Sequence, residues 1–253
     1  MDANFRFYAE LNEFLPRDRQ YQTLQISFKD RQSVKHLIES SGIPHTEVDL
    51  VLVNGQSVDF SYLVRQGDRV AVYPVFESVD ITPLLKLRPA PLREARFVLD
   101  GHLGRLAAYL RMLGFDSLYR NDYNDQELAK ISDEQKRILL TRDRGLLKRS
   151  LVTRGYCLRT RDPRQQLLGV VRRFDLLGQV QPFTRCITCN GKLEPVSKTK
   201  IEDQLEPLTR KYFQEFSRCE QCGQIYWKGS HHDRMQALLD WLKTESDGNS
   251  TDF

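Results

Sequence analysis

The sequence predicts an α/β protein with a parallel sheet covered by helices on both faces, a small β-rich domain at the N-terminus and a metal-binding element near the C-terminus. Three observations lead to this prediction. Short apolar runs alternate with stretches of helical periodicity between residues 97 and 171, and the first 78 residues follow a ββαββ order. Two Cys-x-x-Cys pairs lie between residues 186 and 222.

Length and composition are those of a globular protein with two or three domains. The chain has 253 residues, of which 40% are hydrophobic and 28% charged, a balance that disordered chains lack. The sequence contains no apolar run of the roughly 20 residues needed to span a bilayer, and residues 1–4 lack the pattern of a secretory signal. We therefore expect a cytoplasmic protein without a membrane partner.

The net charge of +4 is distributed unevenly along the chain. Residues 81–180 carry 20 Lys and Arg against 11 Asp and Glu, whereas the segments before and after them are acidic on balance. Of those 20 cations, 16 are Arg, whose planar guanidinium suits phosphate recognition. A polyanionic partner, most simply a nucleic acid, is expected for this segment. A solvated arginine-rich surface is the alternative.

The N-terminal segment has the elements of a small β-rich domain. Alternating apolar residues and turn signals predict strands at residues 5–7, 24–28, 48–53 and 68–73, with a helix that starts at Ser33 between the second and the third. The Asn54-Gly55 pair predicts a turn after the third strand.

The segments VLVNGQSVDF and GDRVAVYP resemble those of ubiquitin-like β-grasp domains related to the small sulfur carrier proteins. Those carriers react through a free C-terminal Gly-Gly, whereas here the last strand continues into Pro74 without such a pair. The resemblance therefore implies a docking module for a protein partner over residues 1–80 and disfavours a sulfur carrier. Residues 81–93 contain three prolines and are expected to form a stiff, extended linker.

The middle of the chain supplies the predicted parallel sheet. The expected strands are residues 97–99, 115–119, 138–141 and 156–159. Four helices are expected between and after them: one that includes Leu103, one that starts near Asp125, one that includes Leu146 and one that starts at Pro163. Gly114 sits where a left-handed cap would end the first helix. Asn124 with Glu127 makes a capping pair, and Asp162 followed by Pro163 is a strong start signal for the last helix.

Three acids in this segment are candidate metal ligands. Asp100 and Asp143 each follow a short apolar strand, and Asp125 lies at the start of a helix. Because ligands gather at the carboxyl ends of strands in such sheets, we expect these acids to share one edge and to hold one or two Mg²⁺ or Mn²⁺ ions. For Asp125 the alternative is an acid that complements the helix dipole, and Asp162 is interpreted as a simple N-cap.

The stretches FVLDGHLGRLAAYLRMLGFD, NDQELAK and ILLTRDRGLLKR resemble the PIN-like ribonuclease domain that occurs with a zinc ribbon at the C-terminus of the Mut-seven nucleases. The resemblance covers about residues 95–240. It implies a PIN-like domain over residues 94–180. It also implies that the protein is an enzyme, which cleaves RNA with a Mg²⁺ or Mn²⁺ ion held by Asp100, Asp125 and Asp143. The alternative is a non-catalytic RNA-binding or ribosome-associated adaptor.

Four arginines close in sequence to the acids are candidates for RNA contact: Arg105, Arg111, Arg142 and Arg144. Arginines at such places bind backbone phosphates or neutralise developing charge. The alternative is that they pair with the acids and hold the site together.

The two Cys-x-x-Cys pairs predict a closed, four-thiolate zinc site. They are Cys186 with Cys189 and Cys219 with Cys222, separated by 29 residues. Such a set gives a tetrahedral structural Zn²⁺ site, and Gly191 and Gly223 permit the tight turns that it needs. Redox chemistry or an iron centre is the alternative. We expect a zinc ribbon over residues 181–243 with a helical insertion over residues 201–216.

The segment behind the second cysteine pair combines aromatic and basic residues. Trp227, Lys228 and His231 could stack a base and hold a phosphate, as in proteins that bind single strands. The alternative for Trp227 is packing between the ribbon and the nuclease-like core. A helix is expected over residues 236–243, followed by a flexible polar tail over residues 244–253.

Overall fold

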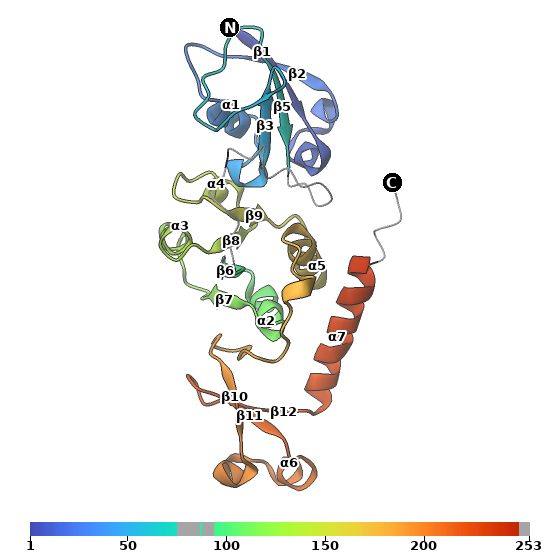
Figure 1. Ribbon diagram of the computed structural model, residues 1–253. Helices are drawn as coiled ribbons and strands as arrows, with labels where there is room; N and C mark the ends of the chain where they lie inside the picture. The colour runs from blue at the N-terminus through green and yellow to red at the C-terminus, as the bar shows by residue number, and fades with distance from the viewer. Residues whose placement is uncertain (75–86, 88–93, 248–253) are drawn as a thin grey trace. The chain divides into compact units, whose positions relative to one another are not determined.

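The computed structural model describes residues 1–74, 87 and 94–247, and it confirms the mixed α/β architecture (Figure 1). The chain divides into two compact units. The first comprises Met1–Glu94 and Asn124–Arg159, and the second comprises Ala95–Tyr123 and Thr160–Phe253. Apart from Leu87, the predicted linker lies outside the described residues.

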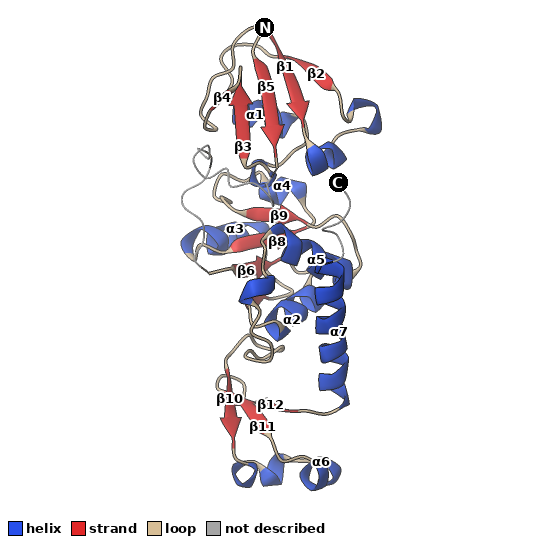
Figure 2. Cartoon of the chain, turned by 45° about the vertical axis from the view of Figure 1, so that its right-hand side comes forward, coloured by secondary structure: helices blue, strands red, loops and turns tan. Residues whose placement is uncertain are grey.

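The N-terminal part of the first unit is a five-stranded sheet in the order β2-β1-β5-β3-β4 (Figure 2). Its elements are β1 (Asp2–Phe7), η1 (Ala9–Phe14), η2 (Arg17–Arg19), β2 (Thr23–Ser27), α1 (Val34–Ser40), η3 (His45–Glu47), β3 (Leu50–Val53), β4 (Gln56–Ser57) and β5 (Arg69–Tyr73). Strand β1 is parallel to β5 and antiparallel to β2. The predicted ββαββ order is present, and β4 is an addition that follows the turn at Asn54 and Gly55, whose φ angles are 51° and 84°.

A second sheet contains the strands β7, β6, β8 and β9 in that order. The elements of this region are β6 (Arg96–Leu99), α2 (Gly104–Met112), β7 (Asp116–Tyr119), α3 (Asp125–Glu134), β8 (Ile138–Thr141), α4 (Arg144–Leu147), β9 (Gly155–Cys157) and α5 (Pro163–Arg173). Strand β6 pairs with β7 in parallel, and so does β8 with β9. Helix α2 packs against β7 and α5, while α3 and α4 pack against β8. All four residues of β8 are buried, as expected for an inner strand of a parallel sheet.

The predicted helix boundaries of this region follow from local capping. Asn124 and Glu127 form a reciprocal capping box at the start of α3. The Asp162 carboxylate accepts hydrogen bonds from the first backbone N–H groups of α5, which begins at Pro163. Gly114 follows α2 with a φ of 96°, the left-handed conformation that the sequence predicts for it.

The C-terminal part of the second unit is a three-stranded antiparallel ribbon sheet in the order β10-β11-β12. Its elements are η5 (Leu177–Gln179), β10 (Leu193–Val196), η6 (Lys198–Lys200), η7 (Glu202–Gln204), α6 (Pro207–Tyr212), β11 (Phe216–Cys219), β12 (Ile225–Trp227) and α7 (Ser230–Asp247). The insertion expected to be helical over residues 201–216 contains only η7 and the short α6. Ile201, Leu205 and Phe216 pack together as its small core, and Phe216 already belongs to β11.

Helix α7 is longer at both ends than the sequence predicts. It begins at Ser230 and continues through Asp247, so the first residues of the expected tail are helical, and residues 248–253 lie outside the described residues. Contact with α5 accounts for the C-terminal extension, because Arg172 on α5 donates a hydrogen bond to the carbonyl of Glu245. Among the described helices, none combines the length and apolar composition required to cross a membrane.

Within the first unit, the N-terminal domain contacts the segment that contains α4 and β9. The hydrogen bonds that join them include Arg144 Nη1 to Phe14 O, Lys148 Nζ to Glu39 O, His45 Nε2 to Val152 O, Cys157 N to Glu47 Oε1, and Arg159 Nη1 to Glu13 Oε2. The Glu47 side chain is 1% exposed and lies 2.6 Å from the Cys157 nitrogen. A buried carboxylate is costly unless it is hydrogen-bonded, so this contact ties η3 to β9 specifically.

Candidate metal centre and acidic site

The four cysteines of the ribbon form one compact cluster. Cys186 Sγ lies 3.6 Å from Cys222 Sγ, and Cys189 Sγ lies 3.4 Å from Cys219 Sγ. All four sulfur atoms are within 4.8 Å of one another. Tetrahedral zinc with Zn–S bonds of about 2.3 Å separates its sulfur ligands by about 3.8 Å. The cluster therefore fits a structural metal ion such as zinc, as the sequence predicts.

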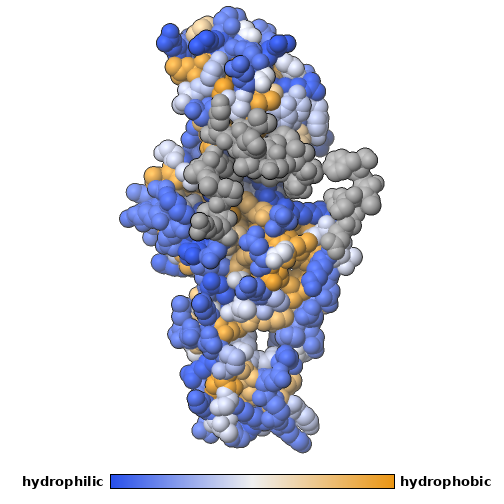
Figure 3. Space-filling view, viewed as in Figure 1, coloured by the Kyte–Doolittle hydropathy of each residue, from blue (hydrophilic) through white to orange (hydrophobic). Residues whose placement is uncertain are grey.

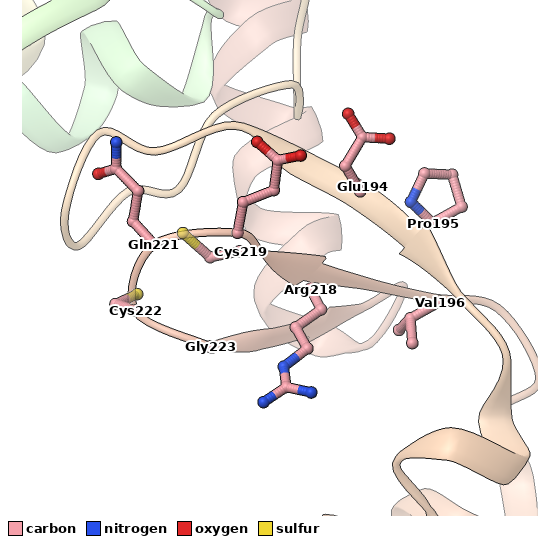
Figure 4. A pocket seen from close by; sticks show the side chains of 9 residues that line it. Glu194, Pro195, Val196, Arg218, Cys219, Gln221, Cys222 and Gly223 are labelled. Atoms are coloured by element: carbon pink, nitrogen blue, oxygen red, sulfur yellow. The ribbon is translucent and has the colours of Figure 1, made fainter.

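The two knuckles have matching backbone turns. Gly191 O accepts from Cys186 N in the first, and Gln224 O accepts from Cys219 N in the second. Figure 4 shows Cys219 and Cys222 on the second knuckle, where the chain leaves β11. Gly191 is required at its position, because a Cβ atom there would lie 2.8 Å from Cys219 Sγ.

The pKa values of two thiols in the cluster are shifted in opposite directions. Burial raises the pKa of the Cys189 thiol to about 12. Burial alone would also raise the pKa of Cys186, but hydrogen bonds from the Tyr226 hydroxyl and from backbone groups lower it to about 6. Closely packed thiolates repel one another, and a metal ion removes that repulsion by coordinating them all.

Arg111 joins the first knuckle to helix α2 and strand β7. Its side chain is 4% exposed, and Nε donates to the carbonyl of Ser117 while Nη1 donates to the carbonyls of Ile187 and Thr188. Burial lowers the pKa of this guanidinium. The predicted contact between Arg111 and RNA phosphate does not agree with this placement, because the side chain is buried and bonded within the protein.

Asn190 forms a second link between the same elements. It has a φ of 73°, and its side-chain oxygen accepts from Ser117 N while its amide nitrogen donates to Asp116 Oδ1. Sequence reasoning missed this residue. The sequence feature that could have revealed it is an Asn directly after the first Cys-x-x-Cys pair, because Asn tolerates the left-handed conformation that this position needs.

Asp100 lies in a tight loop between β6 and α2. Its backbone carbonyl accepts from Leu103 N, and the Tyr119 hydroxyl donates to the carbonyl of Gly101 at 2.8 Å. A Cβ atom on Gly101 would lie 2.8 Å from the Asn121 carbonyl, so glycine is needed there. The Asp-Gly-x-x-Gly pattern is thus explained by close packing of this loop on the chain that leaves β7, and the Asp100 residue is partly exposed.

Asp125 is the first residue of α3 and is exposed. Asn124 and Glu127 perform the capping, so the Asp125 carboxylate is not needed for that role. Its Oδ2 atom lies 3.5 Å from Arg149 Nη2, and both side chains are about half exposed. Sequence reasoning missed Arg149, because Asp125 and Arg149 are 24 residues apart. The fold brings the start of α3 close to the end of α4.

Asp143 follows β8 and caps α4. Its backbone nitrogen donates to the hydroxyl of the fully buried Thr141, and its Oδ1 atom accepts from Gly145 N at 2.7 Å. The Thr-x-Asp pattern therefore fixes the backbone of the acid at the end of the strand. One carboxylate oxygen is engaged in capping, and the residue is exposed. The meeting of Asp100, Asp125 and Asp143 at one edge stays a prediction.

The other candidate RNA-binding residues are placed at the surface. Arg105 and Arg142 are exposed, whereas Arg144 lies over the Phe14 ring at 4.8 Å and donates to the Phe14 carbonyl. Arg144 thus helps to hold the N-terminal domain, in addition to any contact with RNA.

The aromatic and basic residues after the second knuckle lie on β12 and at the start of α7. Trp227 is 37% exposed, and its ring centroid is 6.3 Å from that of Phe213. Lys228 forms an exposed ion pair with Glu215, and His231 is exposed in the first turn of α7. Their role in RNA binding stays a prediction.

Comparison with known families identifies both parts of the chain. A family model described as Mut7-C RNAse domain matches residues 95–239, and one described as Mut7-C ubiquitin matches residues 1–80. The first match covers more than half of the chain, and it includes the three aspartates and the four cysteines. Comparisons with curated proteins and with solved structures gave no match.

Removal of two cysteines is expected to abolish metal binding. The double substitution Cys186→Ser, Cys219→Ser takes one ligand from each knuckle, so the protein should lose its metal ion and the ribbon its cooperative folding. Elemental analysis should find about one zinc per chain in the wild type and in a Cys157→Ala control, since Cys157 lies outside the cluster. Retention of the metal by the double variant would contradict the four-thiolate site.

Replacement of Arg111 is expected to affect stability. Arg111→Met leaves three backbone carbonyls without their donor, which should lower the free energy of unfolding by about 2–4 kcal/mol. Urea denaturation of the full chain measures this change. The matched control is Arg105→Met, an exposed arginine on the same helix, which should change stability by less than about 0.5 kcal/mol. Equal effects of the two substitutions would refute the structural role of Arg111.

Proposed function

Because the chain belongs to the Mut7-C RNase domain family, we propose that it is a metal-dependent ribonuclease that hydrolyses RNA phosphodiester bonds. The family match over residues 95–239 is the observation that carries this proposal. The ligands that we assign to the catalytic Mg²⁺ or Mn²⁺ ion are Asp100, Asp125 and Asp143. We further propose that the ion in the four-cysteine cluster is zinc.

The local geometry supports this assignment of the acids. Each lies at the end of a strand or the start of a helix, and each is exposed or partly exposed. Packing of α3 and α4 against the same strand, β8, fixes the elements that carry Asp125 and Asp143. Oxygen ligands from carboxylates are those that Mg²⁺ and Mn²⁺ prefer.

The residues of the chain would act mainly by positioning. A bound Mg²⁺ or Mn²⁺ supplies Lewis acidity, which activates a water and neutralises charge that develops on the phosphate. Thr141 and Gly145 hold the Asp143 backbone and one of its carboxylate oxygens, so the other oxygen is oriented without further reorganisation. Arg105 and Arg142 are exposed near the acids in sequence and would bind backbone phosphates.

The other parts of the chain have supporting roles in this proposal. The ubiquitin-like domain over residues 1–80 would bind a protein partner, and the zinc ribbon would extend the RNA-binding surface. Cysteines used as metal ligands suit a reducing compartment, and we therefore place the protein in the cytoplasm.

A non-catalytic RNA-binding adaptor is the second candidate. The ion pair between Arg149 and Asp125 favours it, because an arginine already neutralises one of the proposed ligands. In the adaptor, the acids and Arg149 would stabilise the fold, and RNA would be bound without being cut.

Cleavage of labelled RNA distinguishes the two candidates. In the presence of Mn²⁺, the wild type should cut single-stranded or structured RNA, and EDTA should stop the reaction. Asp143→Asn and Asp100→Asn should each reduce the rate by about 100-fold or more, the scale on which loss of a group that stabilises the transition state acts. The control Asp133→Asn alters a partly exposed acid paired with Lys136 and should leave the rate unchanged. Bound but uncut RNA with every protein would establish the adaptor.

A further inference from the structure

The second unit contains a cavity that the acidic site does not use. It has a volume of about 650 Å³ and is lined by residues of α2, α5, the first knuckle, β12 and α7. In the space-filling view, a hollow opens between the ribbon and the part of the molecule that carries α7 (Figure 3). A cavity of this size falls within the range of small-molecule and nucleotide sites.

Aromatic side chains from three segments line this cavity. Tyr109 lies on α2, Tyr226 and Trp227 lie on β12, and His231 lies at the start of α7. The Tyr226 hydroxyl is 3.0 Å from Cys186 Sγ, which fixes this ring against the metal cluster. Flat aromatic rings provide stacking surfaces that every base can use.

The charge around the cavity is of one sign. Arg164 and Arg234 line it and are exposed, and among the described residues that line it there is no Asp or Glu. The hollow on the ribbon itself differs, because two acids, Glu194 and Glu220, line it together with Arg218. Figure 4 shows Glu194 and Arg218 among its lining residues. The cavity between the ribbon and α2 is therefore the one suited to an anionic ligand that has a flat apolar part.

Helix α2 connects this cavity to the loop of Asp100. Residues four apart share one face of a helix, so Arg105 lies one turn before Tyr109 on the same side. Gly104, the first residue of α2, follows the Asp100 loop directly. A strand that placed a base at Tyr109 could therefore place a neighbouring phosphate at Arg105, on the way to Asp100.

We propose that this cavity binds one unpaired base of a single-stranded RNA, stacked on Tyr109, with the adjoining phosphates held by Arg164 and Arg234. The proposal rests on the proposed function, since it identifies the class of RNA that the ribonuclease would use. In this proposal, the zinc ribbon forms one side of the substrate-binding surface. Duplex RNA, whose bases are already stacked and paired, cannot fill the cavity in this way.

RNA binding by a cleavage-deficient protein tests this proposal. The chain has two Trp residues, so the Asp143→Asn, Trp241→Phe protein retains Trp227, in the cavity wall, as its single indole reporter. Titration with a short polyuridine strand should change the fluorescence of Trp227 until the signal saturates. A duplex RNA of equal length should bind more weakly. Elemental analysis and thermal unfolding of each variant verify that the ribbon is intact.

Substitutions in the same background assign the contact. Tyr109→Ala should weaken binding of the single strand by about 5- to 100-fold, the usual effect of removing one stacking partner, while Tyr109→Phe should keep most of the affinity. Tyr212→Ala removes an exposed tyrosine from α6, outside the cavity, and should have no effect. Arg234→Gln should lower the dependence of log Kd on log salt by about one unit or less.

The outcomes separate this proposal from that of the previous subsection. Equal affinities of the Tyr109→Ala and Tyr212→Ala proteins, or equal binding of single strand and duplex, would overturn the base-binding cavity. A fluorescence change with an acidic peptide but not with RNA would assign the cavity to a protein ligand and also overturn it. Binding that depends on Tyr109, in a protein whose wild type cuts no RNA, would support the cavity while refuting the ribonuclease.

Discussion

The buried guanidinium of Arg111 is the interaction on which the second unit depends. It donates to carbonyls of β7 and of the first cysteine knuckle, so helix α2, a sheet strand and the ribbon share one side chain. A buried charge is tolerated only when its donors are satisfied. The carbonyls of Ile187 and Thr188 therefore point toward Arg111, and the turn from Cys186 to Cys189, which could enclose a metal ion, provides that orientation. Binding of the metal and docking of the ribbon are thus expected to be coupled.

The same contacts shape the cavity between α2 and the ribbon. The Ile187 carbonyl accepts a hydrogen bond from Arg111, and Ile187 also lines the cavity. Tyr226 lines the cavity too, and its hydroxyl contacts Cys186 Sγ. The cysteine cluster therefore supports one wall of the cavity directly. In the proposed function, a metal ion held by these cysteines would keep this wall in place without touching a molecule bound in the cavity, so removing the ion would disturb the proposed binding surface together with the ribbon.

Sequence reasoning succeeded where the deciding interactions are local. The capping box of Asn124 and Glu127, the Asp162-Pro163 helix start and the cysteine pairs each act within a few residues, and the structure contains all of them. It failed where partners are distant in sequence. Arg111 looked like a phosphate ligand because nothing near it reveals that Ile187 and Thr188, more than 70 residues away, supply its acceptors. The C-terminal end of α7 depends likewise on contact with α5, since Arg172 bonds to the carbonyl of Glu245. A shared position of the three acids would be a long-range property of the same kind, and it stays a prediction.

The role of the N-terminal domain follows from where its contacts fall. Arg144, Lys148, Val152 and Cys157 contact it from the segment between α4 and β9, and Arg159, two residues after β9, pairs with Glu13. That segment begins with Asp143, the cap of α4, and contains Arg149, which pairs with Asp125. Helix α4 has only four residues, too few to be stable alone. Contacts from the ubiquitin-like domain therefore stabilise the short helix whose first turn orients Asp143. In the proposed ribonuclease, a partner bound to this domain would therefore influence the position of Asp143 through α4.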